Sequence, residues 1–98
     1  MDVDAIHKAL ANPVRRRILG WLKEPERYFS GQEHPMSMGV CAKAIGQRAG
    51  LSQSTISVHL SALADAGLVA SQRIGQWIFF KRDEVVIRAF IDGMNSGL

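Results

Sequence analysis

The chain has 98 residues, of which 47% are hydrophobic and 21% charged, and it carries 12 basic and 9 acidic residues. These values are typical of an ordinary folded protein and exclude a disordered or collagen-like chain; the length predicts one domain, residues 1–98. A single cysteine excludes an internal disulfide framework and favours a reducing compartment. No apolar run reaches the roughly 18 residues of a membrane span. Because Asp2 and Asp4 do not resemble the cationic start of a signal peptide, we expect a cytoplasmic protein.

The net charge of +3 is small, but the basic residues are concentrated in the middle of the chain. Residues 40–82 contain five basic residues and one acidic residue, whereas residues 83–98 contain three acidic residues and one basic residue. A phosphate backbone would therefore be attracted to the middle of the chain and not to its acidic end.

Two helices are expected at the start, over about residues 3–11 and 13–23. Asn12-Pro13 separates them, because proline suits the first turn of a new helix. Residues 25–38 contain proline, glycine and scattered polar residues, which predict a loop. We expect this loop to pack over the first and last helices, and the alternative is an effector pocket formed by Tyr28, Phe29, His34 and Met36.

The clearest helix is expected over about residues 53–66, after a tight turn at residues 50–52 that ends another helix over about residues 39–49. Gly50 suits a helix end because glycine adopts the left-handed conformation at little cost, and Ser52 has the oxygen that caps a helix start. Helix-turn-helix proteins join two crossed helices by such a turn and lay the second in the major groove of DNA. This order predicts a DNA-binding protein.

A β-hairpin is expected next, over residues 68–74 and 77–81, with Gly75-Gln76 at its turn. Both segments are rich in β-branched and aromatic residues, and a Gly-X pair favours a type II′ turn. Helical periodicity returns after Asp83 and predicts a final helix. The expected fold is mostly α-helical, with about five helices and a β-hairpin wing, which together make a winged helix-turn-helix.

The helix at 53–66 has two unlike faces. Ile56, Leu60 and Leu63 would hold it on the domain, while small polar side chains lie on the opposite side near its start. Amide and hydroxyl groups there can pair with bases or phosphates, and Ser52 already serves as the cap. The residues predicted to contact DNA are Gln53, Ser54, Thr55, Ser57, Val58 and His59 on this helix, Lys43 and Arg48 on the preceding helix, and Arg73 and Gln76 beside the hairpin tip.

The residues resemble those of the ArsR/SmtB family of bacterial winged-helix regulators over nearly the whole chain. The segments that carry the resemblance are ALANPVRRRIL at 9–19, GLSQSTISVHL at 50–60, AGLV at 66–69 and the Gly75-Gln76 wing. The resemblance implies a repressor that binds an imperfect inverted repeat near a promoter until an inducer lowers its affinity. It also implies a homodimer joined by the first and last helices, with an interface formed by Val3, Ile6, Leu10, Val86, Phe90, Ile91 and Met94.

Metal sensing is not expected, although many relatives bind metals. They use a Cys-x-Cys pair or Asp and His pairs on the last helix, whereas this chain has Cys41-Ala42-Lys43 and no histidine after Asp83. We therefore predict no metal and no cofactor. His59 has no acidic or sulfur partner at ligand spacing, which favours a histidine fixed by hydrogen bonds beside the core or in contact with a phosphate.

Two alternatives remain open for the function. Cys41 could sense redox changes, because Lys43 and a helix N-terminus favour the thiolate, although a lone cysteine is more often a small core residue. The winged helix could also bind a protein instead of DNA. An enzyme is not expected, because the chain has no Ser/His/Asp order, no phosphate-binding glycine loop and no paired-carboxylate motif.

Overall fold

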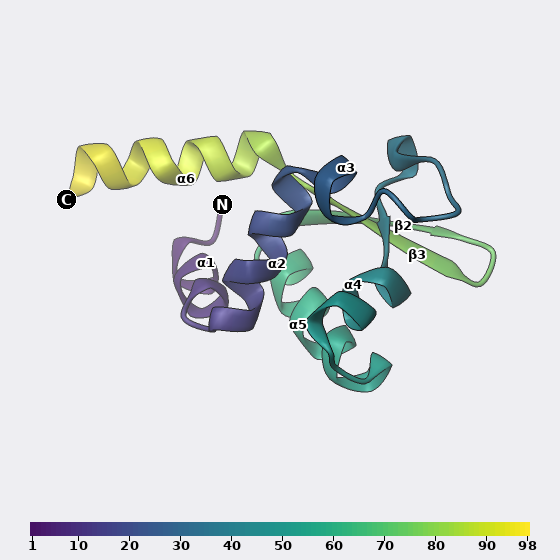
Figure 1. Ribbon diagram of the computed structural model, residues 1–98. Coiled ribbons are helices and arrows are strands. Elements are labelled where there is room, and N and C mark those ends of the chain that lie inside the picture. Colours follow the sequence, from purple (N-terminus) through teal and green to yellow (C-terminus); the bar gives the residue numbers. More distant parts are fainter.

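A computed structural model describes all 98 residues and contains six α-helices and a three-stranded sheet (Figure 1). The helices are α1 (Val3–Leu10), α2 (Pro13–Lys23), α3 (Pro25–Tyr28), α4 (Ala42–Ala49), α5 (Gln53–Asp65) and α6 (Glu84–Gly97). The strands are β1 (Val40–Cys41), β2 (Val69–Ile74) and β3 (Trp77–Arg82), preceded by a 3-10 turn, η1 (Met36–Met38). The expected winged helix-turn-helix is present, with a short additional helix and an additional strand.

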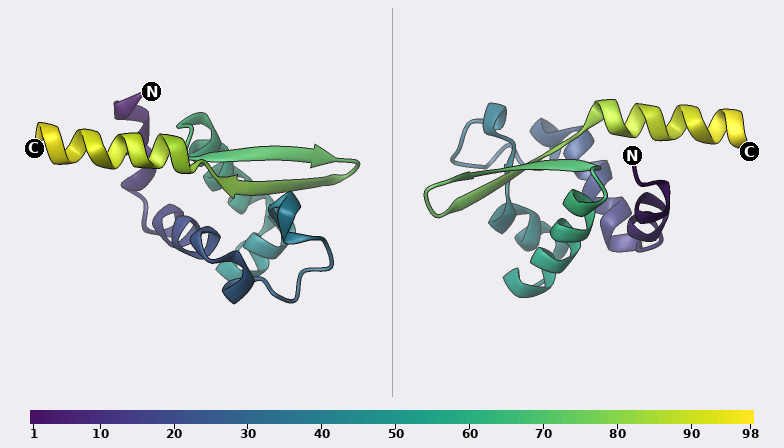
Figure 2. Two further views of the ribbon diagram at one scale, coloured as in Figure 1. Left: turned by 90° about the horizontal axis from the view of Figure 1, so that it is seen from above. Right: turned by 180° about the vertical axis from the view of Figure 1, so that it is seen from behind.

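The two ends of the molecule are formed by α6 and by the hairpin of β2 and β3, which project in opposite directions (Figures 1 and 2). The extents are accordingly 42 × 25 × 23 Å. None of the helices combines the length and the apolar character needed to cross a membrane.

The start of α2 follows from Asn12 and Pro13. The side-chain oxygen of Asn12 accepts hydrogen bonds from the backbone amides of Val14 and Arg15, at 2.9 and 3.3 Å. Pro13 takes the first helical position, where an N–H has no partner within the helix. Both ends of this helix agree with the sequence prediction.

The core lies where α1, α2, α4 and α5 meet one face of the sheet. Its fully buried side chains include Ile6, Ile18, Ile45, Ile56, Leu60 and Leu63. Burial of the three predicted α5 residues holds that helix on the domain and leaves its opposite side exposed. Ile6 is 0% exposed, so its predicted place in a dimer interface is wrong: its side chain is already covered within the protomer.

The segment from Gly39 to Cys41 was predicted as the start of a helix and is instead extended. Val40 pairs with Phe80 and Cys41 with Phe79 at one edge of the sheet, which has the strand order β1-β3-β2. Gly39 has φ 97° and ψ −168°, a conformation that essentially only glycine adopts. This backbone geometry excludes a helical turn at Gly39, and α4 begins at Ala42.

Replacing Gly39 by alanine is expected to destabilise the protein. A Cβ there would lie 2.7 Å from the carbonyl oxygen of Phe80, and the backbone conformation alone would cost roughly 1–3 kcal/mol. Urea unfolding should show a lower midpoint. The matched control is Gly31→Ala, because a Cβ at Gly31 meets nothing within 4 Å; equal stability of the two variants would contradict this explanation.

The segment 25–38 does not pack over the first and last helices, as the sequence had suggested. It lies beside the sheet, where the His34 ring contacts Trp77 and Phe79 at centroid distances of 5.2 and 5.0 Å. Gln32 fixes the segment: its amide donates to the carbonyls of His34 and Gly39 and accepts from the Cys41 amide. The neighbouring aromatic rings of β3 could not be identified as its partners from local sequence.

The hairpin turn agrees with the sequence prediction. The pairing of Ile74 with Trp77 leaves Gly75 and Gln76 as the two central residues. Gly75 has φ 60° and no non-glycine residue has a positive φ, which is the pattern of a type II′ turn and excludes type I′. This turn fixes which residues stand at the tip of the wing.

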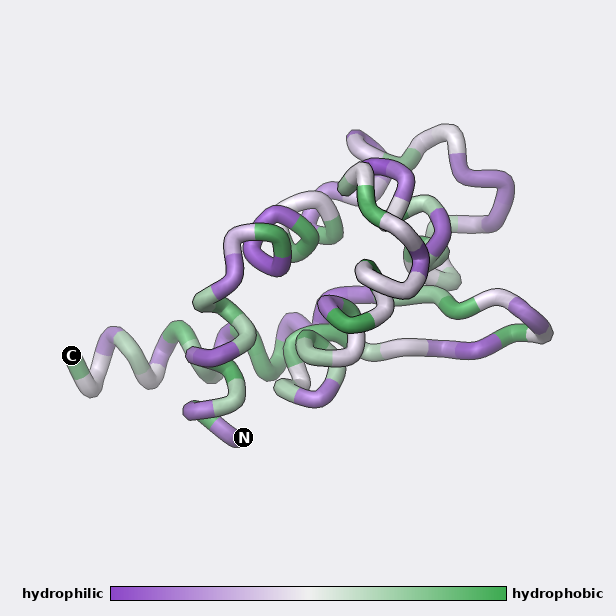
Figure 3. Tube along the Cα trace, turned by 90° about the horizontal axis from the view of Figure 1, so that it is seen from below, coloured by the Kyte–Doolittle hydropathy of each residue, from purple (hydrophilic) through white to green (hydrophobic).

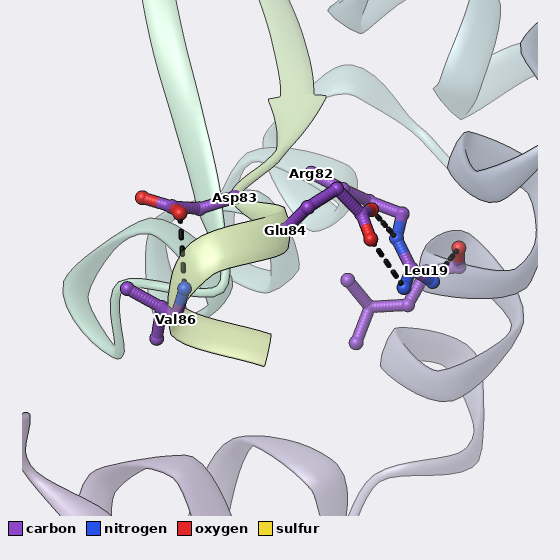
Figure 4. A network of polar contacts seen from close by, with 5 residues as sticks. All are labelled: Leu19, Arg82, Asp83, Glu84 and Val86. Carbon is purple, nitrogen blue, oxygen red and sulfur yellow. Dashed lines mark hydrogen bonds and ion pairs between the residues drawn. The ribbon is translucent and has the colours of Figure 1, made fainter. Parts of the chain in front are cut away.

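Arg82 joins the end of the sheet to two helices (Figure 4). Its Nε donates to Glu84 at 2.6 Å at the start of α6, and its Nη1 donates to the carbonyl of Leu19 in α2 at 3.1 Å. Asp83 caps α6 by accepting from the Val86 amide at 3.1 Å. The direction in which α6 leaves the domain is thus set by side chains at its first turn.

Candidate nucleic-acid interface

The turn between α4 and α5 has the geometry that a helix-turn-helix requires. Gly50 is left-handed, with φ 70° and ψ 29°, and the amide of Leu51 donates back to the Gly46 carbonyl at 3.1 Å. Ser52 then caps α5, accepting from the Thr55 amide at 3.2 Å. Both helix ends therefore have hydrogen-bond partners without using Ser57.

The outward side of α5 is formed by Ser54, Val58 and Ser61, which are all exposed. Val58 is 62% exposed, a high value for an apolar residue at the middle of a helix. The hydroxyl bonds of this region join Ser52 to Ser54 and Thr55, which leaves Ser57 available to a ligand. Ser61 belongs to this side by helical spacing, although it was not among the predicted contacts.

Gln53 lies on the flank of α5 that faces α4. Its amide covers Gly46, where a Cβ would overlap it, and that Cβ would also lie 3.2 Å from Ile56. Glycine at this position therefore lets the two helices approach closely and gives the Gln53 side chain its place. Gln53 itself remains exposed.

A cleft of about 550 Å³ separates the start of α5 from the wing. Three residues predicted to contact DNA line it together: Lys43 from α4, Gln53 from α5 and Gln76 from the hairpin turn. Arg73 is exposed on β2, opposite Ile78. The structure thus brings α4, α5 and the wing to one side of the molecule, and no acidic residue lines the cleft between them.

Arg48 points elsewhere. Its guanidinium lies 4.6 Å from the ring centroid of Tyr28 and 5.5 Å from that of Trp21, and it donates to the Tyr28 carbonyl at 3.2 Å. The side chain therefore links α4 to α2 and α3. This arrangement gives it a structural role that the sequence did not predict and does not support its predicted contact with DNA.

His59 lies on the other flank of α5, facing α2. Its Nδ1 accepts a hydrogen bond from Nε of Arg15 at 3.2 Å, and both residues are half-buried. The expectation of a histidine fixed by hydrogen bonds is met. Thr55, one turn earlier on the same flank, is exposed. Arg15 was not among the predicted contacts, because an arginine run on a helix is usually a solvated face; its bond to His59 joins positions 44 residues apart.

The residues predicted for a dimer interface differ in their exposure. Val3 and Ile91 are 43% and 47% exposed. Leu10, Val86 and Phe90 are half-buried and pack partly on the core, and Met94 is half-buried farther along α6. With Ile6 inside the core, the remaining six residues lie on α1 and α6.

Cys41 and the segment before it do not form an obvious sensing centre. The thiol belongs to β1 and not to a helix, and the residue is 6% exposed. No group of three or more His, Cys, Asp and Glu side chains is placed to hold a metal ion.

Three of the four residues suggested for an effector pocket, Tyr28, Phe29 and His34, border a cleft of about 430 Å³, and Met36 does not. The effector-pocket interpretation therefore stays a prediction for those three residues.

The known proteins that are similar to this chain are transcriptional regulators. A sequence model of the family described as "Bacterial regulatory protein, arsR family" matches residues 41–71, which include the end of β1, all of α4 and α5, and the start of β2. The HTH-type transcriptional regulator YbzH of Bacillus subtilis is 40% identical over 98 residues, 98% of each chain. The transcriptional repressor SdpR of the same organism is 28% identical over 89 residues, covering 91% of this chain and 84% of the repressor.

A solved structure shares the fold. The homodimeric winged helix-turn-helix DNA-binding domain of Mb0332 from Mycobacterium bovis superimposes with a TM-score of 0.68 at 28% identity. The superposition covers 96% of this chain and 76% of the other.

Proposed function

This chain belongs to the ArsR family of winged helix-turn-helix transcriptional regulators, and we propose that it is a repressor that binds an inverted-repeat operator as a homodimer. It is a DNA-binding regulator and not an enzyme. The observation that carries the proposal is the exposed side of α5, where Ser54, Val58 and Ser61 stand opposite three fully buried residues. In this proposal residues 1–98 form one domain that both binds DNA and dimerises, in the cytoplasm.

In the proposed complex α5 lies in the major groove, which is wide enough to admit a helix. Its central side chains face base edges: hydroxyls can bond bases, and Val58 can touch a thymine methyl group. The wing lies beside the groove, where Arg73 and Gln76 approach the DNA backbone, and Lys43 shares the cleft between wing and helix. Each protomer then covers one half-site.

The proposed dimer rests on the character of α6. This helix has 14 residues and no buried residue, and its length is marginal for an isolated helix in water. Apolar residues recur along it among polar ones (Figure 3). Together with the first residues of the chain, α6 forms an apolar hollow that is lined by Met1, Val3, Phe90 and Met94. A second copy packed on α1 and α6 would cover this surface.

Symmetry gives the operator a definite form. Because a two-fold dimer presents its two α5 helices to the same side of the duplex, the half-sites should lie about 10 to 10.5 base pairs apart, or a multiple of that distance. The test is fluorescence anisotropy with DNA from the region upstream of the gene. Affinity should fall steeply as salt rises, because phosphate contacts release counterions. Binding that is indifferent to salt would instead favour a module that contacts proteins.

Single alanine substitutions at Gln53 and Ser57 should weaken operator binding without unfolding the protein, because both residues are exposed. The expected loss is roughly 1 to 3 kcal/mol for each residue that reads a base edge. Anisotropy with the same operator measures it. Unchanged affinity in both variants would mean that another side of α5 enters the groove.

An inducer and its site stay open within this proposal. The redox alternative is less favoured, because a thiol that is 6% exposed and has no second cysteine in the chain is poorly placed for oxidation. A thermal-shift screen of metals, oxidants and small ligands, followed by operator binding, would identify an effector of either kind.

A further inference from the structure

We infer that Arg15, on α2, is a further DNA-binding residue, which contacts a phosphate on the side of α5 opposite the wing and holds His59 in position for the same strand. This inference rests on the proposed function and adds a second backbone contact to it. It concerns residues from two helices that are distant in sequence and adjacent in the fold (Figure 1).

The hydrogen bond between the two side chains defines which atoms remain for DNA. Nε of arginine can only donate, so His59 Nδ1 accepts in the bond of 3.2 Å and the ring N–H lies at Nε2. The ring therefore presents an N–H donor at the atom that does not face Arg15. This bond is also the only side-chain hydrogen bond of Arg15, so Nη1 and Nη2 remain available to an acceptor.

No acidic residue neutralises Arg15. The ion pairs of the protein join Arg27 to Glu24 and Arg82 to Glu84, and the first turn of α2 contains no acidic residue. Arg15 is the third residue of that helix, where the aligned peptide dipoles disfavour a cation. The half-buried charge of Arg15 therefore does not help α2 to form, and an external anion beside the guanidinium would stabilise that charge.

The two flanks of α5 show where that anion would be. Ser57 and Ser61 line a cleft of about 360 Å³ together with Ser71 and Ile78, so one flank faces the wing. The bond from Arg15 to His59 shows that the other flank faces α2. A helix in the major groove has a phosphate strand along each side. The wing meets one strand, and Arg15 with His59 meets the other.

The principal test compares Arg15→Gln with the matched control Arg17→Gln. Arg17 is an exposed residue of the same helix that makes no hydrogen bond to α5, so its replacement removes the same charge from the other side of α2. Operator anisotropy should show a loss of about tenfold or more for Arg15→Gln, with a salt slope lower by about two because each dimer has two such contacts. Arg17→Gln should change neither quantity appreciably, and Arg15→Lys should recover the greater part of the affinity.

A second measurement does not depend on comparing stabilities. In an operator whose phosphates are replaced one at a time by neutral methylphosphonate, one position per half-site should weaken the wild-type protein and leave Arg15→Gln unaffected. The nitrogen–proton correlation spectrum of the wild-type His59 ring should also show the proton on Nε2. Equal losses for the Arg15 and Arg17 variants, or a methylphosphonate profile shared by wild type and Arg15→Gln, would overturn the inference. Failure of the wild type to bind DNA in a salt-dependent manner would instead overturn the proposed function.

Discussion

Replacing Val58 by glutamate should abolish specific operator binding while leaving the fold intact. The side chain is 62% exposed at the centre of the outward side of α5, so the substitution costs no packing, and glutamate favours helix more than valine does. In the groove the new carboxylate would face bases between two phosphate strands. Such like-charge juxtaposition costs several kcal/mol, which corresponds to a loss of about a hundredfold or more in affinity.

The matched control for this substitution is Val85→Glu. Val85 is 81% exposed on α6, far along the chain from α5, and the same charge change there should leave operator affinity nearly unchanged. Anisotropy with the operator and thermal unfolding of both variants measure the effect. Retention of affinity by Val58→Glu would place α5 outside the groove.

Ile91→Glu should separate the dimer without unfolding the protomer. Ile91 is 47% exposed on α6 and is not part of the core, so the protomer tolerates a polar residue there. In the proposed interface the carboxylate would be buried without a partner, at a cost of roughly 3–5 kcal/mol. Operator affinity should fall with it, because one protomer alone covers only one half-site.

Sedimentation equilibrium and operator anisotropy of the same samples test this expectation. Val85→Glu again serves as the control, since it introduces the same charge on the same helix away from Phe90 and Met94. A dimer as stable as the wild type in Ile91→Glu would contradict the assignment of α6 to the interface. An Ile91→Glu monomer that binds the operator as tightly as the wild type would contradict the need for two half-sites.

The sequence predicted correctly those helix ends and turns whose conformation depends on neighbouring residues. The break at Asn12-Pro13 predicted where α2 begins, and Gly75-Gln76 predicted the hairpin turn. The turn from Gly50 to Ser52 was predictable for the same reason, because glycine and serine satisfy helix ends locally. The surface of α5 followed directly, since the buried face of a helix determines its exposed face.

The errors concern partners that lie far along the chain. Ile6 belongs to an apolar stripe, but periodicity does not say whether the core or another protomer covers that stripe. The two-residue strand at Val40 and Cys41 is too short to show alternation, and it exists because β3 pairs with it. Arg48 is held by aromatic residues about 20 positions earlier and Arg15 by His59, so both of their roles required the fold.

The central claim is that the outward side of α5 reads the DNA, and an NMR titration of the isotope-labelled protein with its operator tests it most directly. The amide signals of Ser54, Ser57, Val58 and Ser61 should shift or broaden most, together with those around the tip of the wing. Shifts confined to α6 and to residues 25–38, with the α5 signals unchanged, would contradict the claim.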